Sequence, residues 1–369
     1  MRTQHSEPAT ERRTVAEPAG PVAAERGAAD RTRVDELDLA LVHALQINTR
    51  APWTLIGEAL GIDPVTAARR WERLAKSGAA WVDGYLALDR DEGSVYAQVE
   101  IDTGGHLPED VLTSLAADTR MLSLKQTSGG RDLLAIVGAS SFDDLAQYTG
   151  ERISRLPGVR GTRIHVITAV PFEGAQWRLR SLTPAQRALL RPEYADAESP
   201  VPDEPIRPID RRIAHALGSD GRMPLSGLAR ATGASTATVR RRLRVLAAGG
   251  RLSLRCTLAR PLTEFPVSAV YFGSVPAENL DPAVQALRTL PGLRMCSITA
   301  GTHNLILDIW LRTLAEVHTT EALLNRRLAD LGLRITERAV VLRTLKHAGR
   351  LLDRRGHSVG AVPLRSTGD

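Results

Sequence analysis

Apolar residues recur every three or four positions in two regions of the chain, which is the spacing of helices that bury one face. The clearer region follows residue 207, where glycine-containing turns at 219–221 and 232–234 divide the pattern into three short helices. The third helix is predicted to begin at a Ser235 or Thr236 cap and to end before Gly249. The helical apolar positions are Ile209, Ile213, Leu217, Leu228, Val239, Leu243 and Leu246. This arrangement predicts a helix-turn-helix.

Each helical region is followed by a stretch whose alternation predicts strands. The order is strand, helix, strand, strand, helix, strand, which is the βαββαβ arrangement of ferredoxin-like domains. Such a sheet has one face without helices, and we expect the two uncovered faces to pair within the molecule. The predicted strands are 95–101, 121–127, 133–137 and 163–170 in the first stretch, and 267–274, 293–299, 304–311 and 334–345 in the second.

The two regions are copies of one unit. A shift of 172 residues places His43-Ala44-Leu45 on His215-Ala216-Leu217, and Arg69-Arg70 on Arg241-Arg242. One constant offset over about a hundred residues makes chance coincidence very unlikely. The predicted fold class is therefore α+β, with two winged helix-turn-helix domains, each followed by a ferredoxin-like βαββαβ domain.

The remaining segments connect or flank these copies. Residues 1–33 mix both charge signs with Ala, Pro and Gly, which predicts a disordered lead. Five prolines predict a linker at 173–207, with a short helix inside it that begins at a Thr183 cap and Pro184. The Gly/Arg-rich end from Gly349 predicts a frayed tail. The predicted boundaries are 1–33 lead, 34–85 first helix-turn-helix, 86–172 first ferredoxin-like domain, 173–207 linker, 208–258 second helix-turn-helix, 259–345 second ferredoxin-like domain and 346–369 tail.

Charge distinguishes the two helix-turn-helix copies. The whole chain has a net charge of only +6. Residues 208–255 contain ten arginines and two acids, whereas residues 34–83 contain five basic and seven acidic residues. Phosphate contacts dominate the affinity of proteins for DNA. We therefore expect the second copy to bind double-stranded DNA much more strongly, and the first to bind weakly or to serve as a scaffold.

The arginine row of the third helix carries the DNA-binding prediction. Its apolar residues face the core, so Arg240, Arg241 and Arg244 are predicted to face outward. Guanidinium groups reach phosphates and guanine, and a helix N-terminus attracts phosphate. The candidate DNA contacts are Arg222, Ser235, Thr236, Thr238, Arg240, Arg241, Arg242 and Arg244, with Arg69 and Arg70 in the first copy. A plain solvated helix face is the alternative interpretation.

Composition excludes several other classes of function. Aromatic residues make up 4% of the chain, which argues against stacking platforms for single-stranded nucleic acid. Two cysteines, Cys256 and Cys296, exclude a disulfide framework and a cysteine-rich zinc site. No metal or cofactor is predicted. Because no apolar run has the length of a signal peptide core or a membrane span, we expect a soluble cytoplasmic protein without a membrane partner.

The combination resembles the Lrp/AsnC (feast/famine) family of bacterial transcription regulators. The resemblance covers residues 34–345 as two successive units and is most specific in the second helix-turn-helix. The residues that carry it there are Ile209-Asp210-Arg211-Arg212-Ile213, Asp220-Gly221-Arg222, Leu228-Ala229, Thr232-Gly233-Ala234-Ser235, Arg241-Arg242-Leu243, Leu246 and Gly249-Gly250. Two hairpins, 129–133 and 301–305, are similar to the family's Gly-x-x-Asp/Asn-Leu motif. The resemblance implies a sequence-specific DNA-binding regulator.

The resemblance also implies a small-molecule effector, such as an amino acid, between the effector domains, and assembly into homo-oligomers. Family members are typically dimers of single units, so two fused units imply a covalent pseudo-dimer that assembles further. The candidate effector contacts are Gly129, Arg131, Asp132, Gly301, His303 and Asn304. Because the two hairpins differ in sequence, ordinary turn chemistry is the alternative interpretation of these residues.

Two other functions stay open. Some Lrp-like proteins with two units are siroheme decarboxylases, so duplication alone does not exclude catalysis. Such a site is expected to cluster His, Arg and Tyr side chains for propionate binding and general acid catalysis. The histidines here are scattered and no nucleophile–base pair is evident, so no enzyme is predicted. A ligand sensor without direct DNA contact is the other alternative.

Overall fold

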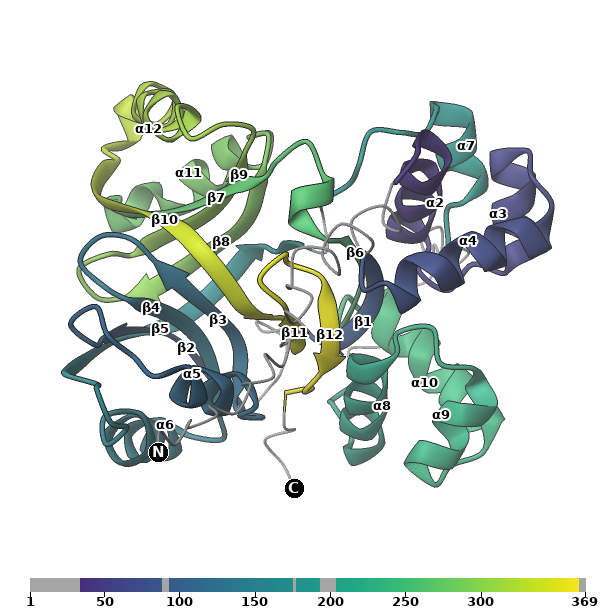
Figure 1. The fold of residues 1–369 in the computed structure, drawn as a ribbon, viewed down its shortest axis with the longest axis horizontal. Coiled ribbons are helices and arrows are strands. Elements are labelled where there is room, and N and C mark those ends of the chain that lie inside the picture. The colour runs from purple at the N-terminus through teal and green to yellow at the C-terminus, as the bar shows by residue number, and fades with distance from the viewer. Residues whose placement is uncertain (1–33, 88–92, 175–176, 193–203, 365–369) are drawn as a thin grey trace, which may run out of the picture. The chain divides into compact units, whose positions relative to one another are not determined.

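The computed structural model describes residues 34–87, 93–174, 177–192 and 204–364, and the lead predicted for 1–33 lies outside them. Two three-helix domains are present, as predicted (Figure 1). The elements of the first are α2 (Glu36–Ile47), α3 (Trp53–Leu60) and α4 (Pro64–Lys76), followed by β1 (Ala80–Leu86). Those of the second are α8 (Pro208–Ser219), α9 (Leu225–Thr232) and α10 (Thr236–Ala248), followed by β6 (Leu252–Leu258).

Local chemistry fixes the turn between the second and third helix in each copy. Gly61 and Gly233 end α3 and α9 at φ of 66° and 67°, a left-handed backbone that glycine adopts without a steric penalty. The side chains of Asp63 and Ser235 then accept hydrogen bonds from backbone N–H groups of the next helix, at 2.8 Å from Val65 and 3.1 Å from Thr238. The two copies therefore hold their third helices in the same way.

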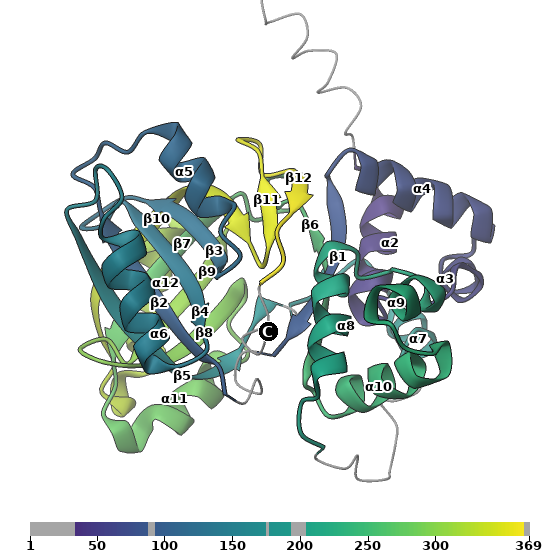
Figure 2. The ribbon, with the colours of Figure 1, turned by 90° about the horizontal axis from the view of Figure 1, so that it is seen from below.

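An antiparallel pair of strands, β1 and β6, joins the two helix-turn-helix domains and lies on the side of the helices that faces the other strands (Figure 2). Asp83 pairs with Arg255, its own counterpart at the 172-residue offset, so a pseudo-two-fold axis passes through this position. The two buried side chains form an ion pair at 3.7 Å. Arg50 and Arg222, also counterparts, exchange contacts across the axis, each donating to backbone carbonyls of the other copy.

Each ferredoxin-like domain has the predicted βαββαβ order. Figure 1 shows α5 and α6 beside the strands of the first domain, and α11 and α12 beside those of the second. The bounds in the first domain are β2 (Val95–Asp102), α5 (Glu109–Ala116), β3 (Met121–Thr127), β4 (Leu133–Ala139), α6 (Phe142–Gln147), a π-helical turn (Tyr148–Ile153) and β5 (Gly161–Phe172). Those in the second are β7 (Val267–Ser274), α11 (Leu280–Leu287), β8 (Leu293–Ala300), β9 (Leu305–Leu311), α12 (Glu316–Arg327) and β10 (Arg334–His347).

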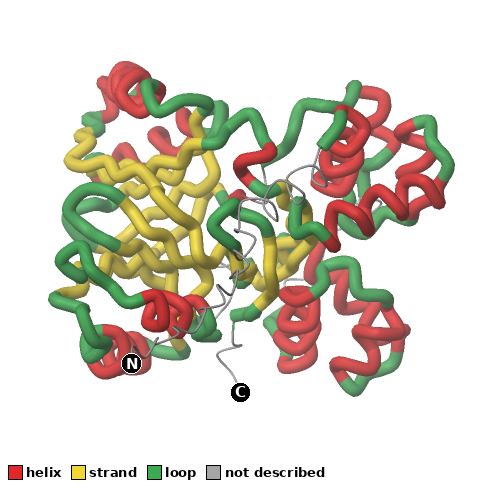
Figure 3. Tube along the Cα trace, in the orientation of Figure 1, coloured by secondary structure: helices red, strands yellow, loops and turns green. Residues whose placement is uncertain are grey.

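The sheets of the two domains join edge to edge into one closed, barrel-like sheet (Figure 3). Strand β5 pairs with β8, and β10 pairs with both β3 and β7. Along β2, Ala97, Val99 and Ile101 pack in the helix-covered core, so the alternate positions Gln98 and Glu100 face the uncovered side. The two uncovered faces thus enclose a common interior that contains buried polar residues, which the expectation of paired faces did not include.

Two connecting segments are more ordered than predicted. The linker contains α7 (Pro184–Leu189) with the predicted Thr183 cap. Leu179, Leu182 and Leu190 are buried in the core of the first helix-turn-helix, so residues 177–192 belong to that domain in space. The prediction of a frayed tail is wrong for residues 350–361, which form a hairpin of β11 (Arg350–Leu352) and β12 (Ser358–Ala361) that extends β10. Backbone pairing with β10 and a hydrogen bond from Ser358 N–H to the Gly78 carbonyl hold it in place.

Candidate functional site

The outer face of α10 carries the exposed arginines that the sequence predicts. Arg240, Arg241 and Arg244 are all exposed, because Val239, Leu243 and Leu246 point into the core. At the start of the helix, Ser235 and Thr236 are exposed and Thr238 is half-buried. The Ser235 hydroxyl lies 2.9 Å from that of Thr238, so both side chains contribute to the N-terminal cap. This end of the helix combines free surface, positive charge and the helix dipole, which suits contact with phosphate.

Arg242 lies inside the domain rather than on this face. Its side chain is 1% exposed and its Nε and Nη2 donate to the Asp210 carboxylate at 2.8 and 2.6 Å. Glu204 accepts a further hydrogen bond from Arg242. The counterpart pair repeats in the first copy, where Arg70 contacts Asp38 at 2.9 Å. The structure therefore gives Arg242 and Arg70 a role in holding the first helix against the third, which differs from the predicted DNA contact.

Arg222 also lies away from the predicted DNA-binding face. Its guanidinium donates to the carbonyls of Thr49 and Ala51 at 2.6 and 2.9 Å and stacks over the Trp53 ring at 4.1 Å. Burial lowers its pKa to about 10, so it stays charged at neutral pH. Arg222 joins the two helix-turn-helix domains instead of facing solvent.

The outer face of α4 is chemically different from that of α10. Arg69 is exposed, as predicted, at the position of Arg241. At the position of Arg244 stands Glu72, which pairs with Lys76 at 2.6 Å. Val65 is an exposed apolar residue near the start of the helix. This face is thus close to neutral, although its backbone geometry matches that of α10.

Two of the predicted effector residues have a structural role in each hairpin. Asp132 accepts hydrogen bonds from the backbone N–H and the hydroxyl of Thr103, at 2.7 and 2.8 Å. Asn304, its counterpart, exchanges two hydrogen bonds with the backbone of Val275, which is the counterpart of Thr103. Gly129 and Gly301 have φ of 94° and 141°, which suits the hairpin turns. Turn chemistry therefore accounts for these four residues.

Arg131 and His303 do come together, in the interior of the closed sheet. Arg131 is 2% exposed, lies 3.9 Å over the Phe272 ring and forms ion pairs with Glu100 and Glu337. The His303 ring lies 5.8 Å from both Phe272 and His165, and His165 contacts Glu100 at 2.7 Å. Burial opposes ionisation of Glu100, but hydrogen bonds from His165 and Arg131 outweigh it and lower the pKa to about 2. Burial lowers the pKa of His303.

A large cavity lies beside the second ferredoxin-like domain, and no sequence pattern predicts it. It has a volume of about 700 Å³ and combines aromatic and basic side chains. Trp177, from the predicted linker, lies 5.7 Å from Trp310 and 6.0 Å from Phe265. The arginines that line this cavity are Arg178, Arg180, Arg288 and Arg312. Aromatic residues 45 to 133 positions apart meet here, so only the fold reveals the site.

The described residues contain no cluster of three or more His, Cys, Asp or Glu side chains that could hold a metal ion. Cys256 and Cys296 are both free and buried, and burial raises their pKa. No helix in the described part of the chain is long and apolar enough to cross a membrane.

Comparison with protein families identifies three segments of the chain. A model described as the AsnC-type helix-turn-helix domain matches residues 34–75 and 208–247. A model described as the Lrp/AsnC ligand binding domain matches residues 95–177. The matches fall on both three-helix domains and on the first ferredoxin-like domain.

Curated relatives correspond in length to one unit of this chain. The HTH-type transcriptional regulator LysM of Sulfurisphaera tokodaii is 27% identical over 141 residues, which are 38% of this chain and 98% of that protein. The HTH-type transcriptional regulator Ptr1 of Methanocaldococcus jannaschii is 25% identical over 147 residues, 39% of this chain and 97% of that protein.

A solved structure matches both units at once. The siroheme decarboxylase NirDL covers 85% of this chain and 93% of its own, with a TM-score of 0.52 and 14% sequence identity. At this identity the similarity is one of fold, and it extends over the paired helix-turn-helix domains and the joined sheets. The chain therefore belongs to the Lrp/AsnC family, in a form in which two units follow one another in one polypeptide.

Proposed function

We propose that this protein is a DNA-binding transcriptional regulator that contacts double-stranded DNA chiefly through α10. The observation that carries the proposal is the exposed arginine face of Arg240, Arg241 and Arg244, beside a capped helix N-terminus. A third helix of this length and polarity fits the major groove, where arginine recognises guanine and phosphate. The neutral face of α4 contributes little affinity in this proposal.

The proposal is tested by gel-shift titration of DNA fragments captured from the source genome by the purified protein. Arg241→Ala combined with Arg244→Ala is expected to weaken binding about a hundredfold and to flatten the salt dependence by about two units. The matched control is Arg69→Ala combined with Glu72→Ala, at the same positions of α4, which is expected to change affinity less than about threefold. Equal losses in the two double variants would contradict the assignment to α10.

The proposed regulator responds to a small-molecule effector at the cluster of Arg131, His165 and His303. This cluster joins residues of both ferredoxin-like domains, and His303 is half-buried and within 2.9 Å of Thr336 Oγ1. A ligand bound there contacts both copies at once. The test is a thermal-shift screen of the twenty amino acids, in which the ligand that raises the melting temperature loses that effect in His303→Ala. Assembly into a homo-oligomer is part of the proposal and is measured by light scattering with and without that ligand.

A second candidate function is decarboxylation of a tetrapyrrole that carries several carboxylates. The large cavity favours it, because about 700 Å³ and four arginines suit a large anionic ring, and aromatic side chains can stack on its face. In such a step an acetate side chain loses CO₂ and its methylene carbon takes up a proton, for which Glu264 and Glu316 are the acids in the lining. Titration with iron-uroporphyrin III, followed by absorbance and by mass spectrometry for loss of CO₂, tests this function separately from DNA binding.

A further inference from the structure

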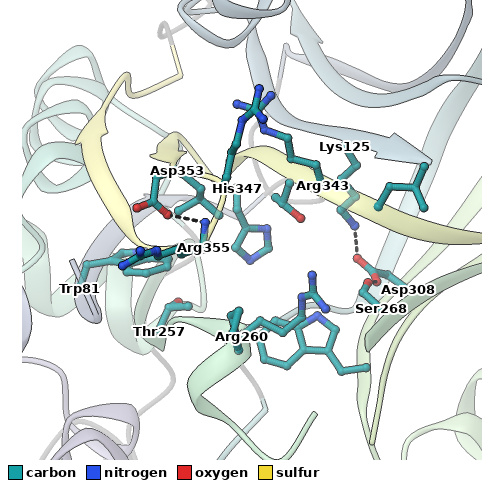
Figure 4. Close-up of a pocket in the computed structure, with 17 residues that line it drawn as sticks. Trp81, Lys125, Thr257, Arg260, Ser268, Asp308, Arg343, His347, Asp353 and Arg355 are labelled. Carbon is teal, nitrogen blue, oxygen red and sulfur yellow. Dashed lines mark hydrogen bonds and ion pairs between the residues drawn. The ribbon is translucent and has the colours of Figure 1, made fainter. Parts of the chain in front are cut away.

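A second, smaller cavity lies where the closed sheet meets strands β1 and β6, next to the turn of the hairpin β11–β12 (Figure 4). Its volume is about 80 Å³, which is several times the space that one water molecule needs. The walls come from five places in the chain. They are β1 and β6 with Trp81 and Thr257, the end of β10 with His347, the loop after β6 with Arg260, the sheet interior with Lys125 and Asp308, and the hairpin turn with Asp353 and Arg355.

Polar atoms at this cavity are buried without a hydrogen-bond partner among the described residues. Thr257 is 4% exposed and its Oγ1 is one such atom. Nε2 of His347 and Nε of Arg343 are two more. Burial lowers the pKa of His347 well below its ordinary value, and the neighbouring cations Arg255 and Lys125 act in the same direction, so the imidazole is neutral. All three groups can donate a hydrogen bond, so the site favours a ligand that accepts them.

The lining is strongly basic. Five Lys or Arg side chains stand against two Asp side chains. Three of the five cations are already paired, because Lys125 pairs with Asp308, and Arg343 and Arg354 pair with Glu109. Asp353 is also occupied, because its Oδ1 accepts from the backbone N–H groups of Arg355 and His357 at 2.9 and 2.8 Å. The Arg260 and Arg355 guanidinium groups have no carboxylate partner in the part of the chain that is described. An anion is therefore the ligand that this charge favours.

The cavity also has apolar walls and a lid. Trp310, Leu342 and Leu352 line it, so part of a ligand can pack against hydrocarbon. The hairpin turn rests on the loop after β6, where a Cβ at Gly356 would lie 3.1 Å from Pro261. Arg350, at the base of the hairpin, donates to the carbonyls of Val82 and Ser219 at 3.1 and 2.7 Å. The lid is thus fixed at both the ferredoxin-like and the helix-turn-helix side.

We propose that this cavity binds a small organic monocarboxylate. The carboxylate accepts hydrogen bonds from Thr257, His347 and Arg260, and the hydrocarbon part packs against Trp310 and Leu352. This site is separate from the hairpin residues Arg131 and His303, and it goes beyond the proposed DNA-binding function without resting on it.

The test is isothermal titration of the full chain, without DNA, with butyrate as the probe. Butyrate is expected to bind saturably, whereas butyramide, which has the same shape and no charge, is not. Arg260→Gln and Thr257→Val are each expected to weaken butyrate binding at least about tenfold, since each removes a donor to the carboxylate. Arg240→Gln, which removes an exposed arginine of α10, is the matched control and keeps the wild-type affinity.

The melting temperature of the unliganded protein distinguishes a ligand-binding role of Thr257 from a structural one. Thr257→Val removes a hydroxyl that has no hydrogen-bond partner among the residues that the structure describes, so the melting temperature of the unliganded protein is expected to stay the same or rise. It therefore tests the site even where Arg260→Gln unfolds the chain. Absence of saturable butyrate binding, equal affinity for butyramide, tighter binding of inorganic phosphate, or wild-type affinity in Thr257→Val would each overturn the proposal. Because the titration contains no DNA, its failure leaves the proposed function of α10 untouched.

Discussion

The two helix-turn-helix domains share a skeleton and differ in their surfaces. Both third helices begin after a left-handed glycine and a side-chain cap, and in both an arginine of the third helix binds an aspartate of the first. On the outer face, however, Glu72 stands where Arg244 stands. The arginine–aspartate pair that builds the domain is thus repeated in both copies. Of the three arginines proposed to bind DNA, Arg241 is repeated as Arg69, whereas Ala68 and Glu72 stand at the positions of Arg240 and Arg244. Comparison of the copies separates the two roles.

The largest difference in stability is expected between Arg242→Ala and Arg70→Ala. Arg242→Ala leaves the fully buried Asp210 without its main partner, which costs about 3–5 kcal/mol of unfolding free energy. Asp38 keeps Arg73 in the Arg70→Ala variant, so the cost there is about 1 kcal/mol. Urea unfolding followed by circular dichroism measures both, with Arg241→Ala as a control within about 0.5 kcal/mol of wild type. Equal costs would show that the two ion pairs are equivalent after all.

As the pH falls, the first helix-turn-helix domain is expected to lose stability before the second. His43 is 3% exposed and its Nδ1 accepts from the Ser181 N–H at 3.1 Å. Burial, reinforced by Arg178 and Arg187, lowers its pKa from 6.5 to about 4. The folded state therefore favours the neutral imidazole. The resulting stabilisation of the folded state is complete above about pH 6.5 and is lost as the pH falls from 6.5 towards 4. Between pH 7 and pH 5 the free energy of unfolding is expected to fall by about 2 kcal/mol.

Denaturant unfolding at pH 7 and pH 5 measures this effect. His43→Gln is expected to reduce the loss of stability between pH 7 and pH 5 by about 2 kcal/mol, and the buried His347, whose pKa is also lowered, accounts for part of the dependence that remains. The counterpart His215 is exposed, so His215→Gln should leave the dependence as in wild type. A wild-type pH dependence in His43→Gln would assign it to another group.

The reciprocal arginines across the pseudo-two-fold axis should behave alike. Each guanidinium donates to two carbonyls of the other copy, and lysine cannot reproduce that fork. Arg50→Lys and Arg222→Lys are each expected to cost about 1–2 kcal/mol of unfolding free energy. DNA affinity of the folded protein should not change in either. A tenfold loss of affinity confined to Arg222→Lys would restore Arg222 as a DNA contact.

The smallest expected effect is a gain of DNA affinity in the first copy. Glu72→Arg makes the outer face of α4 resemble that of α10 and releases Lys76 from its ion pair. We expect about threefold tighter binding and a salt dependence steeper by about one unit. Glu72→Gln, which removes only the negative charge, should show a smaller gain. No change in the salt dependence would mean that α4 does not approach DNA at all.

Sequence patterns are sufficient to predict the helices and strands, but they do not show which side chains contact one another. Hydrophobic period and turn residues predict β3 and β7 to the residue, and the repeat predicts the two-unit organisation. The excess of arginine in the second helix-turn-helix can be counted from the sequence. Which of these arginines is buried cannot be predicted locally, because Arg242 binds Asp210, which lies 32 positions away. The repeat does contain a signal for this buried pair. Asp38 and Arg70 of the first copy recur as Asp210 and Arg242 in the second, although the two copies differ strongly in charge elsewhere.

The packing of residues 177–192 against the first helix-turn-helix and the hairpin β11–β12 are not predicted by the sequence, for a related reason. Prolines and glycines do predict a break in regular structure, yet Leu179 and Leu190 are buried only because the first helix-turn-helix offers them a core. The hairpin β11–β12 has only short strands, and its stability comes from β10 and Gly78, which lie elsewhere in the chain. Long-range contacts of this kind override local composition.

The ion pair on the pseudo-two-fold axis determines which halves of the chain can pair with each other. In an assembly of identical subunits, a residue on the symmetry axis must face another copy of itself. Here that position holds Asp83 in one half and Arg255 in the other. Separated halves that paired with their own kind would bury aspartate against aspartate or arginine against arginine. If the two halves were produced as separate chains, each would therefore be expected to pair with the other half rather than with a second copy of itself, because only that pairing places opposite charges at this position.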